Sequence, residues 1–239
     1  TGTKDVEDTH KFNEANLEAW MAEHVEGYEG PLVVKQFKGG QSNPTYKLET
    51  PKHSFVLRRK PPGKLLPSAH AVDREYRVIS ALHETGFPVA RPHLLCEDDD
   101  VIGTMFYVMD CVDGPIYWEP DLPQCDNESR GEIYDSMNRT IARLHSIDFK
   151  AIGLEDYGKA GNYFERQISR WSKQYIASET ETIKPMNKLM AWLEGNVPSD
   201  QAESIVHGDY RLDNMVCRPT GYSVAAILDW ELSTIGHPL

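Results

Sequence analysis

The pattern of apolar residues changes character near residues 110–114, and this change constrains the fold more than any other feature. Before it, short runs of strand-forming residues alternate with glycine and proline. After it, apolar residues recur at helical spacing over long segments. We therefore expect an α+β chain in two lobes, a small sheet-rich lobe over residues 1–112 and a larger, mainly helical lobe over residues 113–239.

The first lobe is expected to be an antiparallel sheet with one central helix. An earlier helix is expected to begin after Asn13, which is a suitable N-cap, and to end before Gly27. The central helix carries an apolar stripe from Val72 to Leu82 and ends before Gly86. The expected strands cover residues 32–37, 45–49, 54–58 and 104–109, and the acidic run at residues 97–100 is expected to be a solvated loop.

The second lobe is expected to hold long helices followed by short strands. One apolar stripe centres on Met137, and a second runs from Ile168 through Trp171 to Tyr175. A third helix has Pro185 in its first turn. Such stripes predict helix faces that are buried in a core, and strands are expected at residues 204–206, 214–217 and 224–228.

The chain of 239 residues carries 25 Lys and Arg against 37 Asp and Glu, a formal net charge of −12. This charge repels a phosphate backbone, so nucleic acid is not an expected partner. No run approaches the roughly 18 apolar residues that a membrane span needs, and the acidic start lacks a signal-peptide pattern. We expect a cytoplasmic chain, or a matured chain of an organellar matrix, and the oligomeric state is left open.

The cysteines and the chain ends add two further expectations. The 4 cysteines are scattered and form no C-x-x-C pair, which indicates neither a zinc site nor a redox dithiol. The chain begins at Thr1 without Met and ends in G-H-P-L, a segment typical of a domain interior. We therefore expect a fragment whose second lobe is truncated at residue 239.

The most informative motif is H-G-D-x-x-x-x-N at residues 207–214, followed by I-L-D-W at residues 227–230. On its own, H-G-D is equally typical of a tight turn in which Asp209 caps backbone amides. Together, the two motifs resemble the catalytic loop and the metal-binding motif of the aminoglycoside phosphotransferase and choline kinase family. That family has a protein-kinase-like fold, and the resemblance implies the same fold here.

The resemblance also implies a role for each polar residue of these motifs. Asp209 corresponds to the catalytic base, and Asn214 and Asp229 correspond to ligands of Mg²⁺. These residue types suit γ-phosphoryl transfer, which needs a carboxylate for the acceptor hydroxyl and hard oxygen ligands for the metal. A turn at residues 219–221 allows the flanking strands to form a hairpin that brings Asn214 and Asp229 to the same end.

Two adjacent glycines stand between the first two expected strands. Glycine lets the backbone approach a ligand and point N–H groups at phosphate oxygens, although a Gly-Gly pair is more often only a hairpin turn. The segment resembles the G-G-x-S-N loop of the family, which implies contacts with the β- and γ-phosphates. The nucleotide-binding residues expected here are Gly39, Gly40, Gln41, Ser42 and Asn43.

Arg58 ends a strand at the place where protein kinases have the lysine of V-A-I-K, and relatives in the family also use arginine there. The resemblance implies that Arg58 holds the α- and β-phosphates. Glu75 lies in the apolar stripe of the central helix, where a carboxylate needs a cation. We expect Arg58 to be that cation, with Arg59 and Lys60 as rivals. The alternative is that Glu75 lies at the edge of the stripe and is solvated.

The family also implies an adenine site in the segment that joins the lobes. Met109 would be the gatekeeper, and the Asp110 carbonyl and the Val112 amide would bind the adenine edge. Residues that bind the acceptor are expected in the second lobe. The candidates are Arg166, Arg170 and Arg211.

These motifs predict an ATP- and Mg²⁺-dependent kinase that transfers the γ-phosphoryl group to a hydroxyl of a small molecule. Residues 55–67 and 207–214 look closest to the phosphotransferase-like domains related to those fused to acyl-CoA dehydrogenases, which implies a hydroxyacyl-CoA acceptor. The alternative is a non-catalytic nucleotide-binding or regulatory module of a larger assembly. The presence of both the base and the metal ligands favours the enzyme, and the choice between ATP and GTP stays open.

Overall fold

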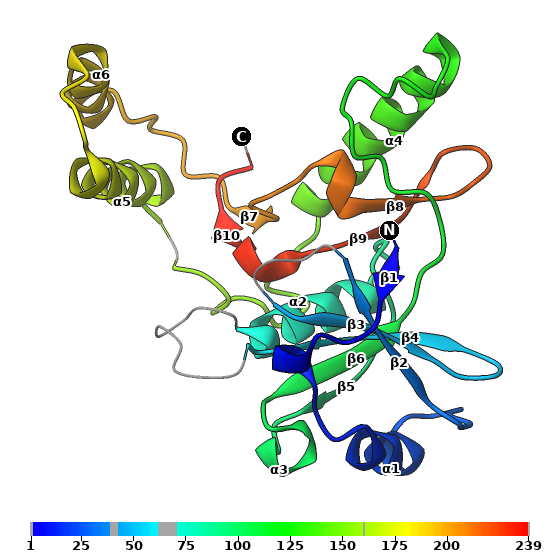
Figure 1. The fold of residues 1–239 in the computed structure, drawn as a ribbon. Coiled ribbons are helices and arrows are strands. Elements are labelled where there is room, and N and C mark those ends of the chain that lie inside the picture. The colour runs from blue at the N-terminus through cyan, green and yellow to red at the C-terminus, as the bar shows by residue number, and fades with distance from the viewer. Residues whose placement is uncertain (1, 39–42, 62–70, 160, 239) are drawn as a thin grey trace. The chain divides into compact units, whose positions relative to one another are not determined.

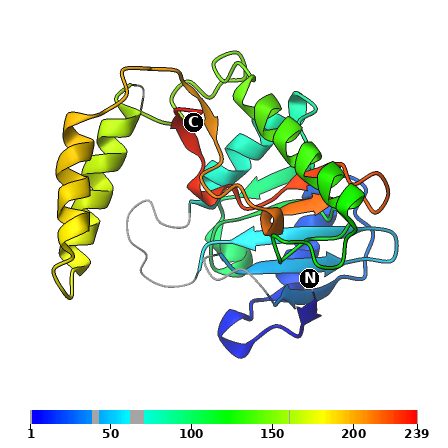
Figure 2. The ribbon, with the colours of Figure 1, turned by 90° about the horizontal axis from the view of Figure 1, so that it is seen from above.

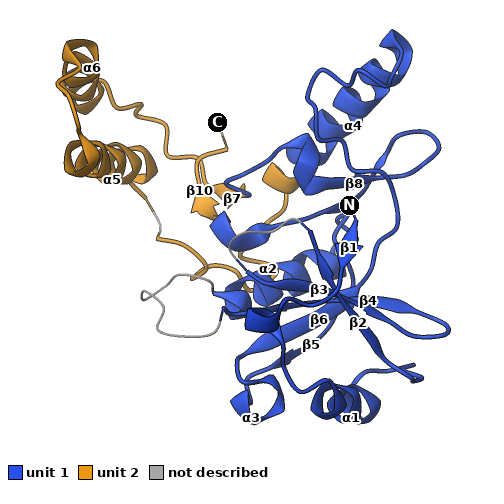
Figure 3. Ribbon diagram, in the orientation of Figure 1, with its two compact units in different colours: residues 1–143, 207–233 blue, residues 144–206, 234–239 orange. Residues whose placement is uncertain are grey.

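The computed structural model describes residues 2–38, 43–61, 71–159 and 161–238. The chain forms two compact units (Figure 3). Unit 1 comprises Thr1–Arg143 and His207–Ser233, and unit 2 comprises Leu144–Val206 and Thr234–Leu239. The expected lobes, residues 1–112 and 113–239, divide the chain differently, and that division stays a prediction.

Unit 1 is built on a six-stranded antiparallel sheet with the strand order β1-β2-β3-β4-β6-β5 (Figure 1). The expected meander is confirmed, because Val34 pairs with Leu48 and Leu48 pairs with Phe55. β1 and β5 were not expected. β1 has only two residues, and β5 begins with a proline, which an edge strand tolerates at its first position. The strands are β1 (Thr3–Lys4), β2 (Val33–Phe37), β3 (Thr45–Glu49), β4 (Ser54–Arg59), β5 (Pro92–Cys96) and β6 (Phe106–Asp110).

The helices of unit 1 begin close to their expected positions. Asn13 caps the first one, because its side chain accepts a hydrogen bond from the backbone N–H of Asn16 at 3.1 Å. The acidic run was wrongly expected to be only a loop, since Asp98 caps a short helix whose buried Ile102 packs into the core. The helices are α1 (Glu14–His24), α2 (Val72–Glu84), α3 (Asp99–Ile102) and α4 (Asn127–His145), with 3-10 turns η1 (Asp8–His10), η2 (Leu212–Asn214) and η3 (Trp230–Leu232).

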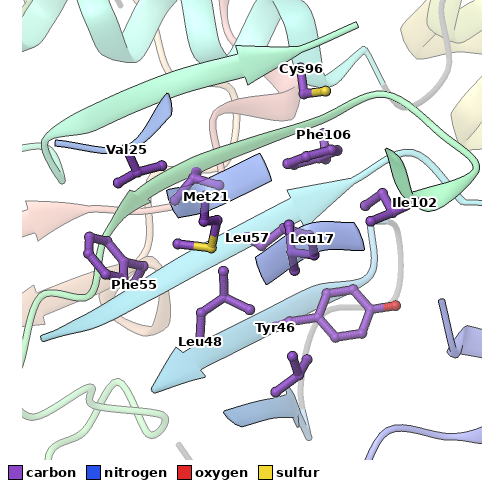
Figure 4. Close-up of a cluster of buried hydrophobic side chains, with 12 residues drawn as sticks. Leu17, Met21, Val25, Tyr46, Leu48, Phe55, Leu57, Cys96, Ile102 and Phe106 are labelled. Atoms are coloured by element: carbon purple, nitrogen blue, oxygen red, sulfur yellow. The ribbon is translucent and has the colours of Figure 1, made fainter. Parts of the chain in front are cut away.

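One hydrophobic core of unit 1 lies between α1 and one face of the sheet (Figure 4). Leu17 and Met21 of α1 pack there against Leu57 of β4 and Phe106 of β6. Because side chains alternate along a strand, the neighbours of Leu57 and Phe106 point to the opposite face. This parity places Arg58 on the face away from α1.

A second, short hairpin completes unit 1. β8 (Met215–Cys217) pairs with β9 (Val224–Ile227) in antiparallel register, as the turn at residues 219–221 predicted. The N–H of Leu228 donates to the carbonyl of Asn214 at 2.8 Å and closes the open end of the hairpin. The residues that flank the hairpin, Asn214 and Asp229, therefore lie at the same end.

Unit 2 contains two helices and a two-stranded antiparallel sheet. α5 (Tyr163–Ser178) and α6 (Lys184–Gly195) lie side by side (Figure 2), and β7 (Ser204–Val206) pairs with β10 (Thr234–Gly236), a strand that was not expected.

The expectation that the apolar stripes of α5 and α6 are buried is wrong for this structure. Neither helix has a buried residue, and Trp171 is 57% exposed. A pair of helices is too small to enclose an apolar face, which needs another packed layer. No helix in the described part of either unit combines the length and the apolar composition that crossing a membrane requires.

Gly114 allows the segment after β6 to run against β8. A Cβ atom at Gly114 would overlap the Cys217 carbonyl oxygen and lie 2.7 Å from Val216 Cγ1, whereas a Cβ at Gly131 of α4 would meet nothing within 4 Å. We expect Gly114→Ala to lower the free energy of unfolding by about 1 to 3 kcal/mol. The matched control, Gly131→Ala, should leave it unchanged or raise it by up to about 1 kcal/mol. Urea unfolding measures both, and equal effects would contradict the close approach.

Candidate functional site

Unit 1 contains a cavity of about 470 Å³ on the face of the sheet that points away from α1. Strands β4 and β6 supply one wall, and the open end of the β8–β9 hairpin supplies another. Seven of the lining side chains matter most for its chemistry. They are Val56, Arg58, Tyr107, Met109, Asp213, Asn214 and Asp229.

Arg58 is the predicted partner of Glu75. Its Nε lies 2.9 Å from Glu75 Oε2, and its Nη2 donates to Oε1 at 3.3 Å. The two side chains are 12% and 1% exposed, so Glu75 is not a solvated residue at the edge of its helix stripe. The prediction of this pair is confirmed, and both charges are largely removed from water.

The two rival cations have other partners. Arg59 points to the α1 side of the sheet, where its Nη2 donates to the carbonyl of His10 at 3.0 Å. Lys60 lies 3.7 Å from Asp73. The alternation of side chains along β4 thus turns Arg59 away from Glu75, and Lys60 lies beside Asp73 instead.

Tyr107 is a site residue that the sequence analysis missed. Its hydroxyl donates to Glu75 Oε2 at 3.0 Å, and it stands directly opposite Arg58 in the sheet. Burial and the nearby Glu75 raise the pKa of Tyr107 well above its usual value, so the hydroxyl remains a donor. Strand parity could have revealed it, because Tyr107 follows the core residue Phe106.

Burial sets the electrostatics of this group. It raises the pKa of Glu75 above its usual value, and Arg58 opposes that shift. Burial also disfavours the charged form of Arg58, but Glu75 and Asp229 outweigh it and raise the pKa of Arg58 above its usual value. The guanidinium is therefore held as a permanent cation inside the protein.

Asp229 joins this group from the other end of the sequence. Its Oδ1 accepts a hydrogen bond from Arg58 Nη2 at 2.9 Å. Its backbone has φ 62° and ψ 65°, a left-handed conformation that few residues other than glycine adopt. Backbone strain of this kind concentrates where a side chain must be aimed at a ligand. Arg58 thus connects α2, β4 and the segment that follows β9.

The loop at residues 207–209 presents Asp209. Gly208 has φ 88°, and a Cβ there would lie 2.6 Å from the Leu232 carbonyl oxygen, so glycine is required. His207 Nε2 donates to the carbonyl of Leu228 at 2.9 Å, while its Nδ1 accepts from the N–H of Asp209 at 3.2 Å. Burial lowers the pKa of His207, in keeping with this neutral form. His207 therefore acts as a fixed spacer behind Asp209.

Asn214 is oriented by Asp209. Its Nδ2 donates to the Asp209 carbonyl at 2.9 Å and to Asp209 Oδ2 at 3.0 Å. These bonds leave the amide oxygen of Asn214 as an acceptor. With the carboxylate of Asp229, it offers the hard oxygen donors that Mg²⁺ prefers, and this metal commonly takes few protein ligands beside phosphate and water. No cluster of three or more His, Cys, Asp or Glu suited to a metal occurs among the described residues.

The adenine site is expected at the end of β6 and in the segment that follows it. Met109, Asp110 and Val112 line the cavity. The amide of Asp110 donates to the Arg91 carbonyl at 2.9 Å, and the amide of Cys111 donates to the Ser54 carbonyl at 3.1 Å. In the described part of the chain, the Val112 amide has no such backbone acceptor, so it can serve a ligand.

Part of the expected nucleotide loop lies outside the described residues, namely Gly39, Gly40, Gln41 and Ser42. Asn43 is described. It is buried and donates to Glu75 Oε1 at 2.8 Å, and it is not among the described residues that line the cavity. A direct contact of this side chain with nucleotide therefore has no support from its position.

The three arginines expected to bind an acceptor have different surroundings. Arg166 and Arg170 belong to α5 of unit 2, where Arg166 Nη2 donates to the Lys159 carbonyl at 2.7 Å. Arg211 lies beside the catalytic-base candidate. Its Nε is 2.9 Å from Asp213 Oδ1 and 3.7 Å from Asp209 Oδ1.

Comparisons with known proteins agree with this geometry. A family model described as the phosphotransferase enzyme family matches residues 33–239. Acyl-CoA dehydrogenase family member 11 of Mus musculus is 47% identical over 99% of this chain, and its human counterpart is 45% identical over 100%. The chain spans only 31% and 32% of the lengths of these two relatives.

Solved structures show the same likeness. A crystal structure from Ralstonia eutropha JMP134, assigned as an aminoglycoside phosphotransferase, is 54% identical, with a TM-score of 0.87 over 95% of this chain and 67% of that one. Aminoglycoside phosphotransferase APH(4)-Ia, solved with AMP-PNP and hygromycin B, is 14% identical, with a TM-score of 0.65 over 93% and 73%. The expected α+β, protein-kinase-like fold is confirmed. The chain belongs to the phosphotransferase enzyme family.

Proposed function

We propose that this chain transfers the γ-phosphoryl group of ATP to a hydroxyl of a small molecule, with Mg²⁺ as the cofactor. The observation that carries the proposal is that Asn214 and the Arg58–Asp229 ion pair line one cavity, while Asn214 also donates a hydrogen bond to the carboxylate of Asp209. This combination offers a carboxylate base, two oxygen ligands for a metal and a buried cation for phosphate, which are the parts that phosphoryl transfer needs.

In the proposed reaction, Asp209 accepts the proton of the acceptor hydroxyl. The acceptor oxygen then forms a bond to the γ-phosphorus, the bond from that phosphorus to the β–γ bridging oxygen breaks, and ADP leaves. The hydrogen bond from Asn214 Nδ2 fixes the carboxylate of Asp209 in the orientation that receives the proton.

The remaining residues bind the nucleotide. Arg58 uses Nε and Nη2 for its carboxylate partners, which leaves the N–H groups of Nη1 for the α- and β-phosphates. Asn214 and Asp229 would hold Mg²⁺, which neutralises charge on the phosphates when it is bound. Met109, the Asp110 carbonyl and the Val112 amide would receive the adenine, and residues 39–42 would follow the phosphates.

The proposed acceptor is a hydroxyacyl-CoA. The relatives named acyl-CoA dehydrogenase family member 11 support this class, because this chain matches a part of each that is about a third of its length. A domain that shares a polypeptide with an acyl-CoA enzyme is well placed to act on the same class of molecule.

An acceptor panel tests this assignment. Purified full chain is incubated with ATP and Mg²⁺ and with hydroxyacyl-CoA thioesters, matched acyl-CoA without a hydroxyl, or an aminoglycoside. We expect ADP and a phosphorylated thioester, seen by mass spectrometry, only with the hydroxylated thioesters. Phosphorylation of the aminoglycoside alone would refute the acceptor class. Absence of ADP formation with every acceptor, despite ATP binding, would favour a non-catalytic nucleotide-binding module.

The role of Asp209 is tested by Asp209→Asn, which keeps the shape of the side chain but removes the base. We expect kcat to fall by about 10² to 10⁴ while the Kd for ATP stays within a few-fold. Asp135→Asn, on the exposed surface of α4, is the matched control and should keep both values. Stopped-time ADP assays and calorimetry supply the measurements, and turnover of Asp209→Asn near that of the wild type would exclude the role.

Asp229→Asn tests the metal site, since it removes a charged ligand and keeps a neutral one. Wild type should bind ATP more tightly with Mg²⁺ than with EDTA. We expect Asp229→Asn to bind ATP with similar Kd under both conditions, because the protein supplies few other oxygen ligands. Calorimetric titration of ATP measures this difference, and an unchanged response to Mg²⁺ would contradict the assignment.

A double-mutant cycle with Arg58→Met and Glu75→Gln tests the buried pair. Either single change leaves one buried group without its main partner, so each should lower the free energy of unfolding and weaken ATP binding. The coupling energy should be about 1 to 3 kcal/mol in urea unfolding. Additive effects, within about 0.5 kcal/mol, would show that the two residues do not interact.

A further inference from the structure

Asn43 holds two carboxylates that come from distant parts of unit 1. Its Nδ2 donates to Glu75 Oε1 at 2.8 Å and to Glu231 Oε2 at 3.3 Å. Asn43 is 1% exposed. Its own carbonyl accepts from Thr45 Oγ1 at 3.0 Å, which fixes the residue just before β3. The amide therefore links β3, α2 and η3 at one point.

Glu231 follows Asp229 by two positions, in the 3-10 turn η3 that packs against α2. Asp229 and Trp230 line the cavity, whereas Glu231 is not among the described lining residues. Its carboxylate is turned to Asn43 instead. Glu231 is therefore suited to hold the Asp229 segment in place and not to bind a metal itself.

The charge balance explains why an amide suits this position. Arg58 is one positive charge facing Glu75 and Asp229, and Glu231 lies on the other side of Asn43. An amide nitrogen has two N–H donors, one for each carboxylate, and no charge. A lysine would also bind both carboxylates, but it would cancel negative charge that attracts a divalent cation. Asparagine joins them and keeps that charge.

We propose that Asn43 and Glu231 are positioning residues that set the affinity of the site for Mg²⁺ by tethering the Asp229 segment to Glu75. The inference rests on the proposed function, in which Asp229 is a metal ligand. Loss of the tether frees the left-handed turn at Asp229, so its carboxylate no longer stays at one place. The affinity for Mg²⁺ therefore falls, while the affinity for ATP without metal stays unchanged.

The test uses the full chain and three variants, Asn43→Ala, Glu231→Ala and the double variant, with Asn138→Ala on the exposed face of α4 as the matched control. The measured quantities are the Mg²⁺ concentration that gives half-maximal ATP binding and the Kd for ATP in EDTA. Each single change should raise the former about tenfold, as for loss of a hydrogen bond to a charged group, and leave the latter within about twofold.

The double variant distinguishes a tether from two separate structural roles. If Asn43 and Glu231 act through one bond, its Mg²⁺ requirement should match that of Asn43→Ala, whereas independent roles would multiply to about a hundredfold. The proposal would be overturned if the effects of the two single changes on the Mg²⁺ requirement multiplied in the double variant. It would also be overturned if ATP binding in EDTA weakened as much as Mg²⁺-dependent binding, or if Glu231→Ala kept the Mg²⁺ requirement of the wild type. Glu231→Ala decides the matter if Asn43→Ala does not fold, because Glu231 is only partly buried. If the wild type itself showed no Mg²⁺-dependent ATP binding, the proposed function would fail, and this inference would fail with it.

Discussion

A guanidinium buried in a protein needs hydrogen-bond acceptors around it, and the buried guanidinium at the centre of this site is that of Arg58. Leaving such a charge unpaired costs several kcal/mol, so its acceptors are held as firmly as the cation itself. They are Glu75 of α2 and Asp229 after β9, at 2.9 Å each. One side chain thereby fixes the distance between the sheet, its helix and the hairpin end. The cavity exists where these three elements meet.

The same cluster gives the proposed Mg²⁺ site its negative charge. Arg58 does not balance both of its carboxylate partners, and at the hairpin end the single charge of Arg211 faces both Asp209 and Asp213. Hydrogen-bond donors fix two of these carboxylates: Tyr107 and Asn43 donate to Glu75, and Asn214 donates to Asp209. Preorganised oxygen ligands of this kind bind Mg²⁺ together with phosphate without much rearrangement.

Local patterns predicted the parts of the site that depend on short stretches of sequence. Asp209, Asn214 and Asp229 follow from two motifs, and the Arg58–Glu75 pair follows from a charged residue in an apolar stripe. The contacts of Tyr107 and Glu231 could not be predicted in this way. The first depends on cross-strand register, and the second joins residues 188 positions apart. Periodicity also predicted α5 and α6 but not their exposure. An apolar stripe indicates an amphipathic helix, but it does not indicate whether another element covers that stripe.

The most direct test of this account is a crystal structure of the chain grown with AMP-PNP and Mn²⁺, whose anomalous signal locates the metal. We expect one anomalous peak at the open end of the β8–β9 hairpin, within about 2.0 to 2.3 Å of both the Asn214 amide oxygen and an Asp229 carboxylate oxygen. The α- and β-phosphates should lie against Arg58. A metal bound elsewhere, or a nucleotide that leaves Arg58 and Asp229 without contact, would contradict it.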